Sequence, residues 1–186
     1  KTMLACGIGA EAAIRFRAEA EVLNRAPRFT YHATYETPPD DIRRRVISYF
    51  SGVHLTRLEA VPYHLTLSRT GRREAYEELM FPTDPRGEWE RYQDVLPYSG
   101  LYKIGNFRGD PENPKAGDGW IGEIRADVER VASRTGVGPG VILIDYALVC
   151  TRRHLRAKGL DPDRHLRHFV GSFGDECRKQ LAAHFN

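Results

Sequence analysis

Apolar and polar residues follow two different periods along the chain, and the change of period marks the predicted elements. Residues 2–20 are rich in alanine and place aliphatic side chains near helical spacing, which predicts a first helix that Gly7 and Gly9 loosen. Residues 28–35 are aromatic and β-branched, which predicts a strand. Residues 37–41, one threonine, two prolines and two aspartates, have the order that favours a helix start.

The later segments continue this alternation of strands and helices. They predict strands at 64–68, 101–107 and 141–147, helices that begin at Asp84, at 121 and at Asp161, a loop at 108–119 and a helix end at Gly136. Strand 141–147 is apolar on successive residues, as in a strand that is covered on both faces. The alternation predicts an α/β fold with a mostly parallel sheet flanked by helices. Since no loop marks a boundary, we expect residues 1–186 to form one domain.

The composition is that of a soluble globular domain, with 41% hydrophobic and 28% charged residues. No segment approaches the roughly 18 apolar residues of a membrane span, and no signal peptide is visible. The cysteines, Cys6, Cys150 and Cys177, form no CxxC pair, so neither a zinc site nor a disulfide framework is predicted, and the cytoplasm is the simplest compartment. The net charge of +3 does not by itself indicate nucleic-acid binding.

Three partial motifs follow one another in an informative order. Two predicted strands end in acidic residues, Glu36 and Asp145, and ligands of parallel sheets bind at that edge. Lys1 and Thr2 open the first helix and fit the last two positions of a phosphate-binding loop, GxxxxGK[ST]. In such a site Lys1 would neutralise the phosphates of ATP, and Thr2 and Asp145 would hold Mg²⁺. Glu36 would orient or deprotonate the attacking water.

Each motif also has a simpler interpretation. A Lys-Thr pair at a terminus is uninformative alone, and Glu36 can simply favour the dipole of the following helix. An aliphatic strand that ends in an aspartate is common in α/β proteins. The chain begins with Lys and ends on a helix end, so we expect a fragment of a longer protein, with a processed terminus as the alternative.

The order of the motifs resembles the RecA-like ATPase core of the DnaB-type replicative helicases, within the wider group that includes KaiC and RadA. Lys1-Thr2 resembles the end of the family's Walker A motif, and residues 34–36 resemble its strand ending in the catalytic glutamate. Residues 121–146 resemble the helix and the Walker B strand, which typically reads apolar-apolar-Ile-Asp-Tyr. The resemblance spans the chain in outline and is weak across 54–119. The loop glycines and the later core strands are missing from the pattern, and residues 147–149 lack the family's usual glutamine, which favours a divergent phage or plasmid member.

The resemblance implies an incomplete RecA-like domain that hydrolyses ATP with Mg²⁺ and moves along single-stranded DNA in DNA replication, as a hexameric homo-oligomer in the intact protein. It also implies a DNA-facing loop soon after the Walker B strand. The segment 151–159 has four basic residues and no acid, namely Arg152, Arg153, Arg156 and Lys158. Their contacts with phosphates would be independent of sequence and sensitive to salt. A solvated surface loop, partly balanced by nearby aspartates, is the alternative.

Two other functions stay open at this point. One is a KaiC- or RadA-like regulatory or recombination ATPase that does not unwind DNA. The other is a nucleic-acid-binding module with a degenerate nucleotide site. A single His-x-Thr element at 64–66 and the histidine pair at 165 and 168 lack the partners that a phosphoesterase or a metal site requires.

Overall fold

A computed structural model describes residues 2–51, 54–56, 100–107, 119–145, 152, 155–156 and 159–185. Its elements are α1 (Thr2–Val22), β1 (Phe29–Thr34), α2 (Pro39–Ser51), β2 (Tyr102–Asn106), α7 (Gly119–Thr135), β3 (Pro139–Asp145), α9 (Pro162–Cys177), a π-helical segment η1 (Arg178–Ala182) and the short α10 (Ala183–Phe185). These elements match the predicted ones within a few residues. The predicted strand at 64–68 and the helix from Asp84 lie outside the described residues, as does the loop at 108–119 except for Gly119.

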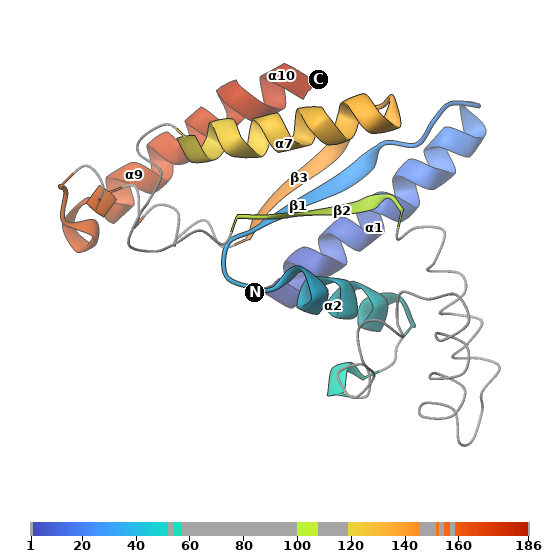
Figure 1. The fold of residues 1–186 in the computed structure, drawn as a ribbon, viewed down its shortest axis with the longest axis horizontal. Coiled ribbons are helices and arrows are strands. Elements are labelled where there is room, and N and C mark those ends of the chain that lie inside the picture. Colours follow the sequence, from blue (N-terminus) through green and yellow to red (C-terminus); the bar gives the residue numbers. More distant parts are fainter. Residues whose placement is uncertain are drawn as a thin grey trace.

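The three described strands form one parallel sheet in the order β2-β1-β3 (Figure 1). β1 is central, so that Thr34 at its end lies opposite Asn106 of β2 and Asp145 of β3. Helices α1 and α2 cover one face, and α7 with the C-terminal helical segment covers the other. The predicted α/β class with a parallel sheet flanked by helices is therefore confirmed.

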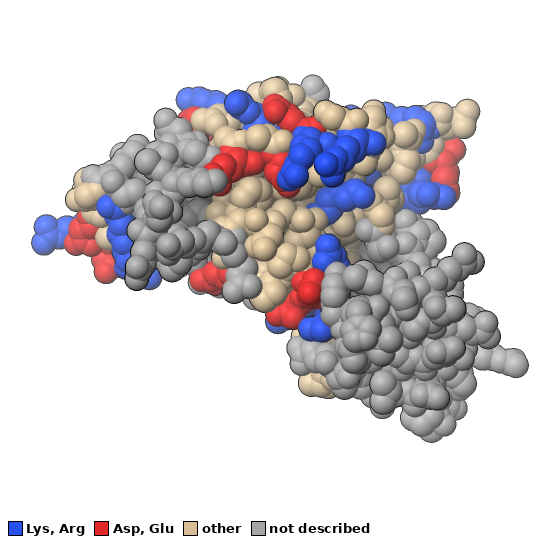
Figure 2. All heavy atoms as spheres, in the orientation of Figure 1, with Lys and Arg blue, Asp and Glu red and all other residues tan. Residues whose placement is uncertain are grey.

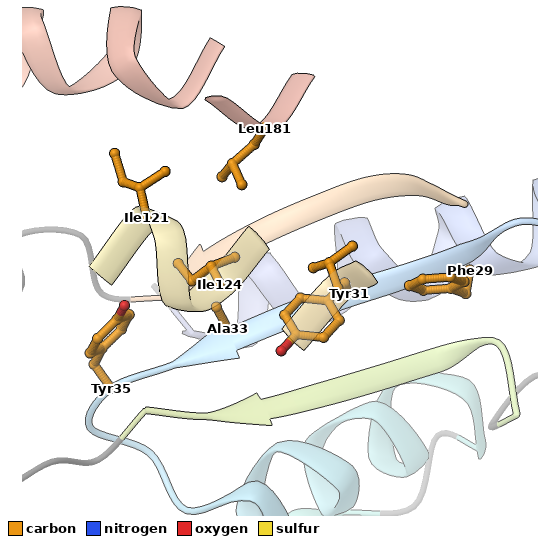
Figure 3. Close-up of a cluster of buried hydrophobic side chains, with 8 residues drawn as sticks. Phe29, Tyr31, Ala33, Tyr35, Ile121, Ile124 and Leu181 are labelled. Carbon is orange, nitrogen blue, oxygen red and sulfur yellow. The ribbon is translucent and has the colours of Figure 1, made fainter. Parts of the chain in front are cut away.

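One face of the sheet carries an apolar core (Figure 3). Alternate residues of a strand point to the same face, and the odd-numbered residues of β1 supply the sheet's share of this core. Residues of α7 at helical spacing pack against these side chains, and η1 contributes Leu181. The core residues are Phe29, Tyr31, Ala33, Tyr35, Ile121, Ile124, Val128 and Leu181. Ile142 and Ile144 of β3 pack against the same core while Leu143 faces α1, so helices lie on both faces of β3, and residues 140–144 are half-buried.

On the opposite face, Gly9 brings α1 unusually close to the sheet. A Cβ atom at Gly9 would lie 2.7 Å from Cδ1 of Leu143 and 2.8 Å from Cε2 of Tyr102. Thr30 Oγ1 uses this proximity to donate a hydrogen bond of 2.9 Å to the Gly9 carbonyl. The prediction that glycines loosen this helix is wrong, because α1 is continuous from Thr2 to Val22. The glycine is needed for close packing instead.

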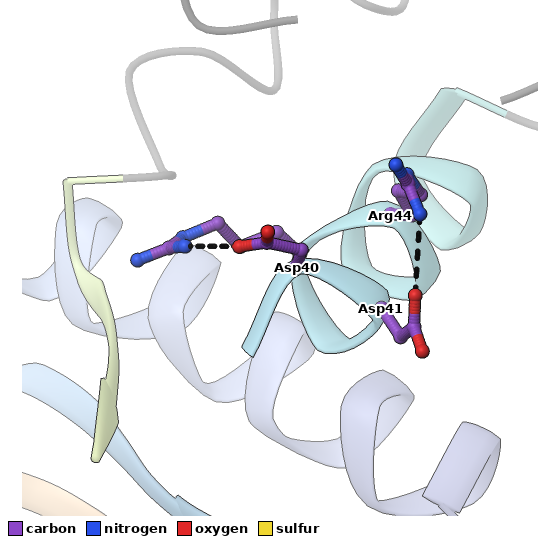
Figure 4. A network of polar contacts seen from close by, with 4 residues as sticks. Asp40, Asp41 and Arg44 are labelled. Atoms are coloured by element: carbon purple, nitrogen blue, oxygen red, sulfur yellow. Dashed lines mark hydrogen bonds and ion pairs between the residues drawn. The ribbon is translucent and has the colours of Figure 1, made fainter. Parts of the chain in front are cut away.

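The start of α2 follows from its sequence of prolines and acids. The carbonyl of Pro38 accepts backbone hydrogen bonds from the first turn of the helix. In that turn Asp40 pairs with Arg43 at 3.0 Å and Asp41 pairs with Arg44 at 3.2 Å (Figure 4). The exposed pair of Asp40 and Arg43 contributes about 0–1 kcal/mol, and the two acids also favour the positive end of the helix dipole. The position of α2 is set mainly by its buried aliphatic residues, which pack on α1.

Candidate functional site

The carboxyl ends of the parallel strands meet at one edge of the sheet, where two of the predicted site residues lie. Asp145 ends β3 beside Thr34, and its carbonyl accepts a hydrogen bond of 3.0 Å from the Tyr35 amide. Glu36 follows in the bend between β1 and α2, with an exposed side chain. Thr34 Oγ1 closes this bend by donating to the carbonyl of Thr37 at 2.8 Å. The two acidic residues are thus held at the ends of neighbouring strands.

α1 runs against the strand direction and brings Thr2 to the same edge. Gly9 contacts the middle of the sheet, whereas Cys6 lies almost one turn earlier, where burial and then the charge of the nearby Asp145 carboxylate raise the pKa of the thiol. Thr2 precedes Cys6 by four residues and therefore lies on the same face of the helix, one turn further toward the edge. In Figure 1 the amino end of α1 lies beside the connection from β1 to α2. Lys1 lies outside the described residues.

A buried polar cluster, which the sequence patterns did not reveal, adjoins Asp145. His32 in the middle of β1 is 0% exposed and Asp145 is 7% exposed. The Nδ1 atom of His32 lies 2.6 Å from the Tyr102 hydroxyl, and its Nε2 atom lies 3.5 Å from Oδ2 of Asp145. The second distance exceeds that of a well-formed hydrogen bond. Nε2 has no hydrogen-bond partner among the described residues.

Burial keeps most of this cluster neutral. It lowers the pKa of His32 below its ordinary value, although the neighbouring Asp145 carboxylate acts in the opposite direction. Burial also raises the pKa of Tyr102 and raises that of Cys6 to about 11, so both keep their protons at neutral pH. The groups near the buried side of Asp145 are therefore the neutral side chains of His32, Tyr102 and Cys6.

The donor set at this edge fits Mg²⁺ better than a metal that needs a full protein cage. The described residues include no group of three or more His, Cys, Asp and Glu side chains that could hold a metal ion. Mg²⁺ commonly takes one or two carboxylates and completes its shell with water and substrate phosphates. The Asp145 carboxylate and the Thr2 hydroxyl supply suitable oxygen atoms. The unpaired Nε2 of His32 beside Asp145 is a further polar group that could hold a ligating carboxylate in place.

The predicted DNA-binding residues are described only in part. Arg153 and Lys158 lie outside the described residues, while Arg152 and Arg156 are exposed. Arg152 lies 3.4 Å from Asp163 in the first turn of α9, as the surface-loop alternative anticipates. Figure 2 shows basic and acidic groups intermingled on the visible face of the described residues, without a large area of one sign.

No protein-family model matches the chain, and no curated protein or solved structure does so. Of the helices that the structure describes, none combines the length and the apolar character needed to cross a membrane. The proposed function therefore rests on the arrangement of the strand ends and of the amino end of α1.

Proposed function

We propose that this chain is the ATPase core of a DnaB-like DNA helicase with a RecA-like fold, which hydrolyses ATP to move along single-stranded DNA in replication. The observation that carries the proposal is the convergence of three elements at one sheet edge. The amino end of α1 with Thr2, the end of β1 with Glu36 and the end of β3 with Asp145 all lie there.

The elements at this edge match what phosphoryl transfer needs. The first amides of α1 have no partner within the helix, and the helix dipole favours negative charge, so this end can receive phosphate. Lys1 would add a positive charge to the phosphates, and Thr2 and Asp145 would hold Mg²⁺. When bound, the ion would neutralise charge that develops on the transferred phosphoryl group. Glu36 has an exposed carboxylate that can orient the attacking water and accept its proton.

The basic residues after β3 would couple this site to DNA. Arg152, Arg153, Arg156 and Lys158 would contact phosphates of single-stranded DNA, in a homo-oligomer that is hexameric in the intact protein. Since these contacts are ionic, the affinity for single-stranded DNA should fall as salt increases.

The experiment that tests the proposal is Glu36→Gln in the full-length protein. Removing the general base should lower ATP turnover by at least about 100-fold while nucleotide binding is kept. The matched control is Glu21→Gln, which changes an exposed glutamate on the distal part of α1 and should leave turnover unchanged. ATP hydrolysis by Glu36→Gln at the parental rate would refute the mechanism.

A strand-displacement assay with the same protein tests the helicase part of the proposal. Unwinding that requires ATP is the expected result. ATP hydrolysis without unwinding would instead indicate a regulatory or recombination ATPase. Salt-dependent binding of single-stranded DNA without any nucleotide binding would indicate a nucleic-acid-binding module.

A further inference from the structure

His32 occupies an unusual position for an imidazole, at the centre of a parallel sheet. β1 is the middle strand, and His32 lies opposite Ile104 of β2 and Leu143 of β3. The side chain is 0% exposed. Burying a polar group without partners costs free energy, so the contacts of both ring nitrogens matter.

The contacts of the ring define its orientation. The Tyr102 hydroxyl lies 2.6 Å from Nδ1, and Oδ2 of Asp145 lies 3.5 Å from Nε2. A neutral imidazole carries one proton. If Nδ1 carried it, the lone pair of Nε2 would face a carboxylate oxygen and the two would repel. The favourable arrangement has the Tyr102 hydroxyl donating to Nδ1, with the N–H of Nε2 directed at Asp145.

The same cluster reaches α1. Cys6 and Tyr102 lie in the same buried cluster between α1, α2 and the sheet, and the pKa of each group, which burial raises, also responds to the other group. Cys6 is on the helical face of Thr2, one turn away. A single set of buried polar contacts therefore links the end of β3 to the first turns of α1, the two elements that carry the proposed Mg²⁺ ligands.

We infer that His32 is a positioning residue for Asp145, which it holds by donating a hydrogen bond from Nε2 to one carboxylate oxygen so that the other oxygen faces Mg²⁺. This inference rests on the proposed function. It requires the 3.5 Å contact between Nε2 and the Asp145 carboxylate to shorten to hydrogen-bond length when the ion is bound. Groups that orient a metal ligand in this way typically change metal affinity or activity 10- to 100-fold when they are removed.

The test is the affinity for Mn²⁺, a spectroscopic substitute for Mg²⁺, measured by electron paramagnetic resonance on the full-length protein with bound ADP. His32→Leu removes the donor and should weaken Mn²⁺ binding by about 10- to 100-fold. His32→Gln offers an amide N–H near the position of Nε2 and should restore the affinity to within about threefold of the parental value. ADP affinity in the absence of metal should be the same in all three proteins.

A third variant keeps the test independent of how well His32→Leu folds. Tyr102→Phe deletes one oxygen atom and leaves the imidazole in place but without its orienting partner. It should also weaken Mn²⁺ binding, by less than His32→Leu. Thermal unfolding without metal reports the stability of each variant separately.

The possible outcomes separate this inference from the proposed function. Parental protein that binds no nucleotide, or binds it without any dependence on metal, overturns both. Metal-dependent binding that is unchanged in Tyr102→Phe, or unchanged in His32→Leu, overturns only the role of His32. Equal losses in His32→Leu and His32→Gln would mean that the imidazole is needed for packing, and would also overturn the positioning role.

Discussion

The two faces of β1 are equally buried but are made from different kinds of residue. All six residues of the strand are buried. Phe29, Tyr31 and Ala33 point to the face covered by α7 and Leu181. The other three, Thr30, His32 and Thr34, point to the face covered by α1.

The difference shows that one strand can stabilise the fold through one face and organise a site through the other. The apolar face gains free energy in proportion to the area removed from water, at about 25 cal/mol per Å², and its one hydroxyl, that of Tyr31, donates a hydrogen bond to Asp127 of α7. The polar face costs free energy wherever a buried group lacks a hydrogen bond, so the partner of each group matters. The Thr30 hydroxyl donates to the Gly9 carbonyl, and the Thr34 hydroxyl donates to the Thr37 carbonyl. Nε2 of His32 lies 3.5 Å from the Asp145 carboxylate.

The largest effect should come from the apolar face. Ile124→Ala removes a fully buried side chain of α7 that packs over β1, and should lower the free energy of unfolding by about 2–5 kcal/mol. Urea denaturation followed by circular dichroism measures the change. The same substitution at Ile8, which is 52% exposed, serves as the control and should change stability by less than about 0.5 kcal/mol. Equal effects at the two positions would contradict the assigned core.

On the polar face, close packing should be the next most sensitive feature. Gly9→Ala introduces a methyl group that meets Leu143 and Tyr102 at under 3 Å, which should cost about 1–3 kcal/mol. Gly122→Ala is the matched control, because its Cβ meets no atom within 4 Å and alanine favours the helix. It should stabilise the protein by up to about 1 kcal/mol. Thermal unfolding of the two variants should therefore shift in opposite directions, and a stabilised Gly9→Ala would refute the close approach of α1.

The hydrogen bond between the sheet and α1 should have a smaller effect. Thr30→Val keeps the shape of the side chain but leaves the Gly9 carbonyl without its donor from the sheet, and should cost about 1 kcal/mol. Urea denaturation measures the loss, and hydrogen exchange of the amides of α1 would locate it. A loss as large as that of Ile124→Ala would mean that the polar face contributes more to stability than its contacts indicate.

A dependence on pH from the apolar side should be absent at neutral pH and appear only in alkaline solution. Burial raises the pKa of Cys177 to about 11, with a smaller contribution from the neighbouring Glu176. The unfolded thiol titrates near pH 8.5, so the folded state keeps a proton that the unfolded state loses between these values. The contribution of the protonated Cys177 thiol to the free energy of unfolding is therefore fully present below about pH 8.5 and is lost as pH rises through about 11. Urea denaturation of the parental protein and Cys177→Ala should show a stability difference that shrinks from about pH 8 to about pH 10.5. If the stability difference between the two proteins were constant over this range, the Cys177 thiol would be exposed to solvent and not buried.

Much of the fold could be predicted because it depends on local periodicity. The helical spacing of Ile121, Ile124 and Val128 predicted α7, and the β-branched and aromatic run at 28–35 predicted β1. Alternation of such segments favours parallel pairing with helices on both faces. Because the carboxyl ends of parallel strands lie at one edge of the sheet, the sequence also predicted that Glu36 and Asp145 lie at the same edge. Their chemical roles stay predictions.

Other features depended on contacts between residues far apart in the chain, and only the tertiary structure decided them. The sequence predicted that Gly9 loosens the first helix, whereas the structure shows that it lets α1 pack closely on the sheet. His32 had no distinguishing pattern, because its partners Tyr102 and Asp145 are 70 and 113 positions away and become neighbours only through strand register. Period and composition report which face of an element is buried, whereas the identity of the partner across that face depends on how the strands and helices pack.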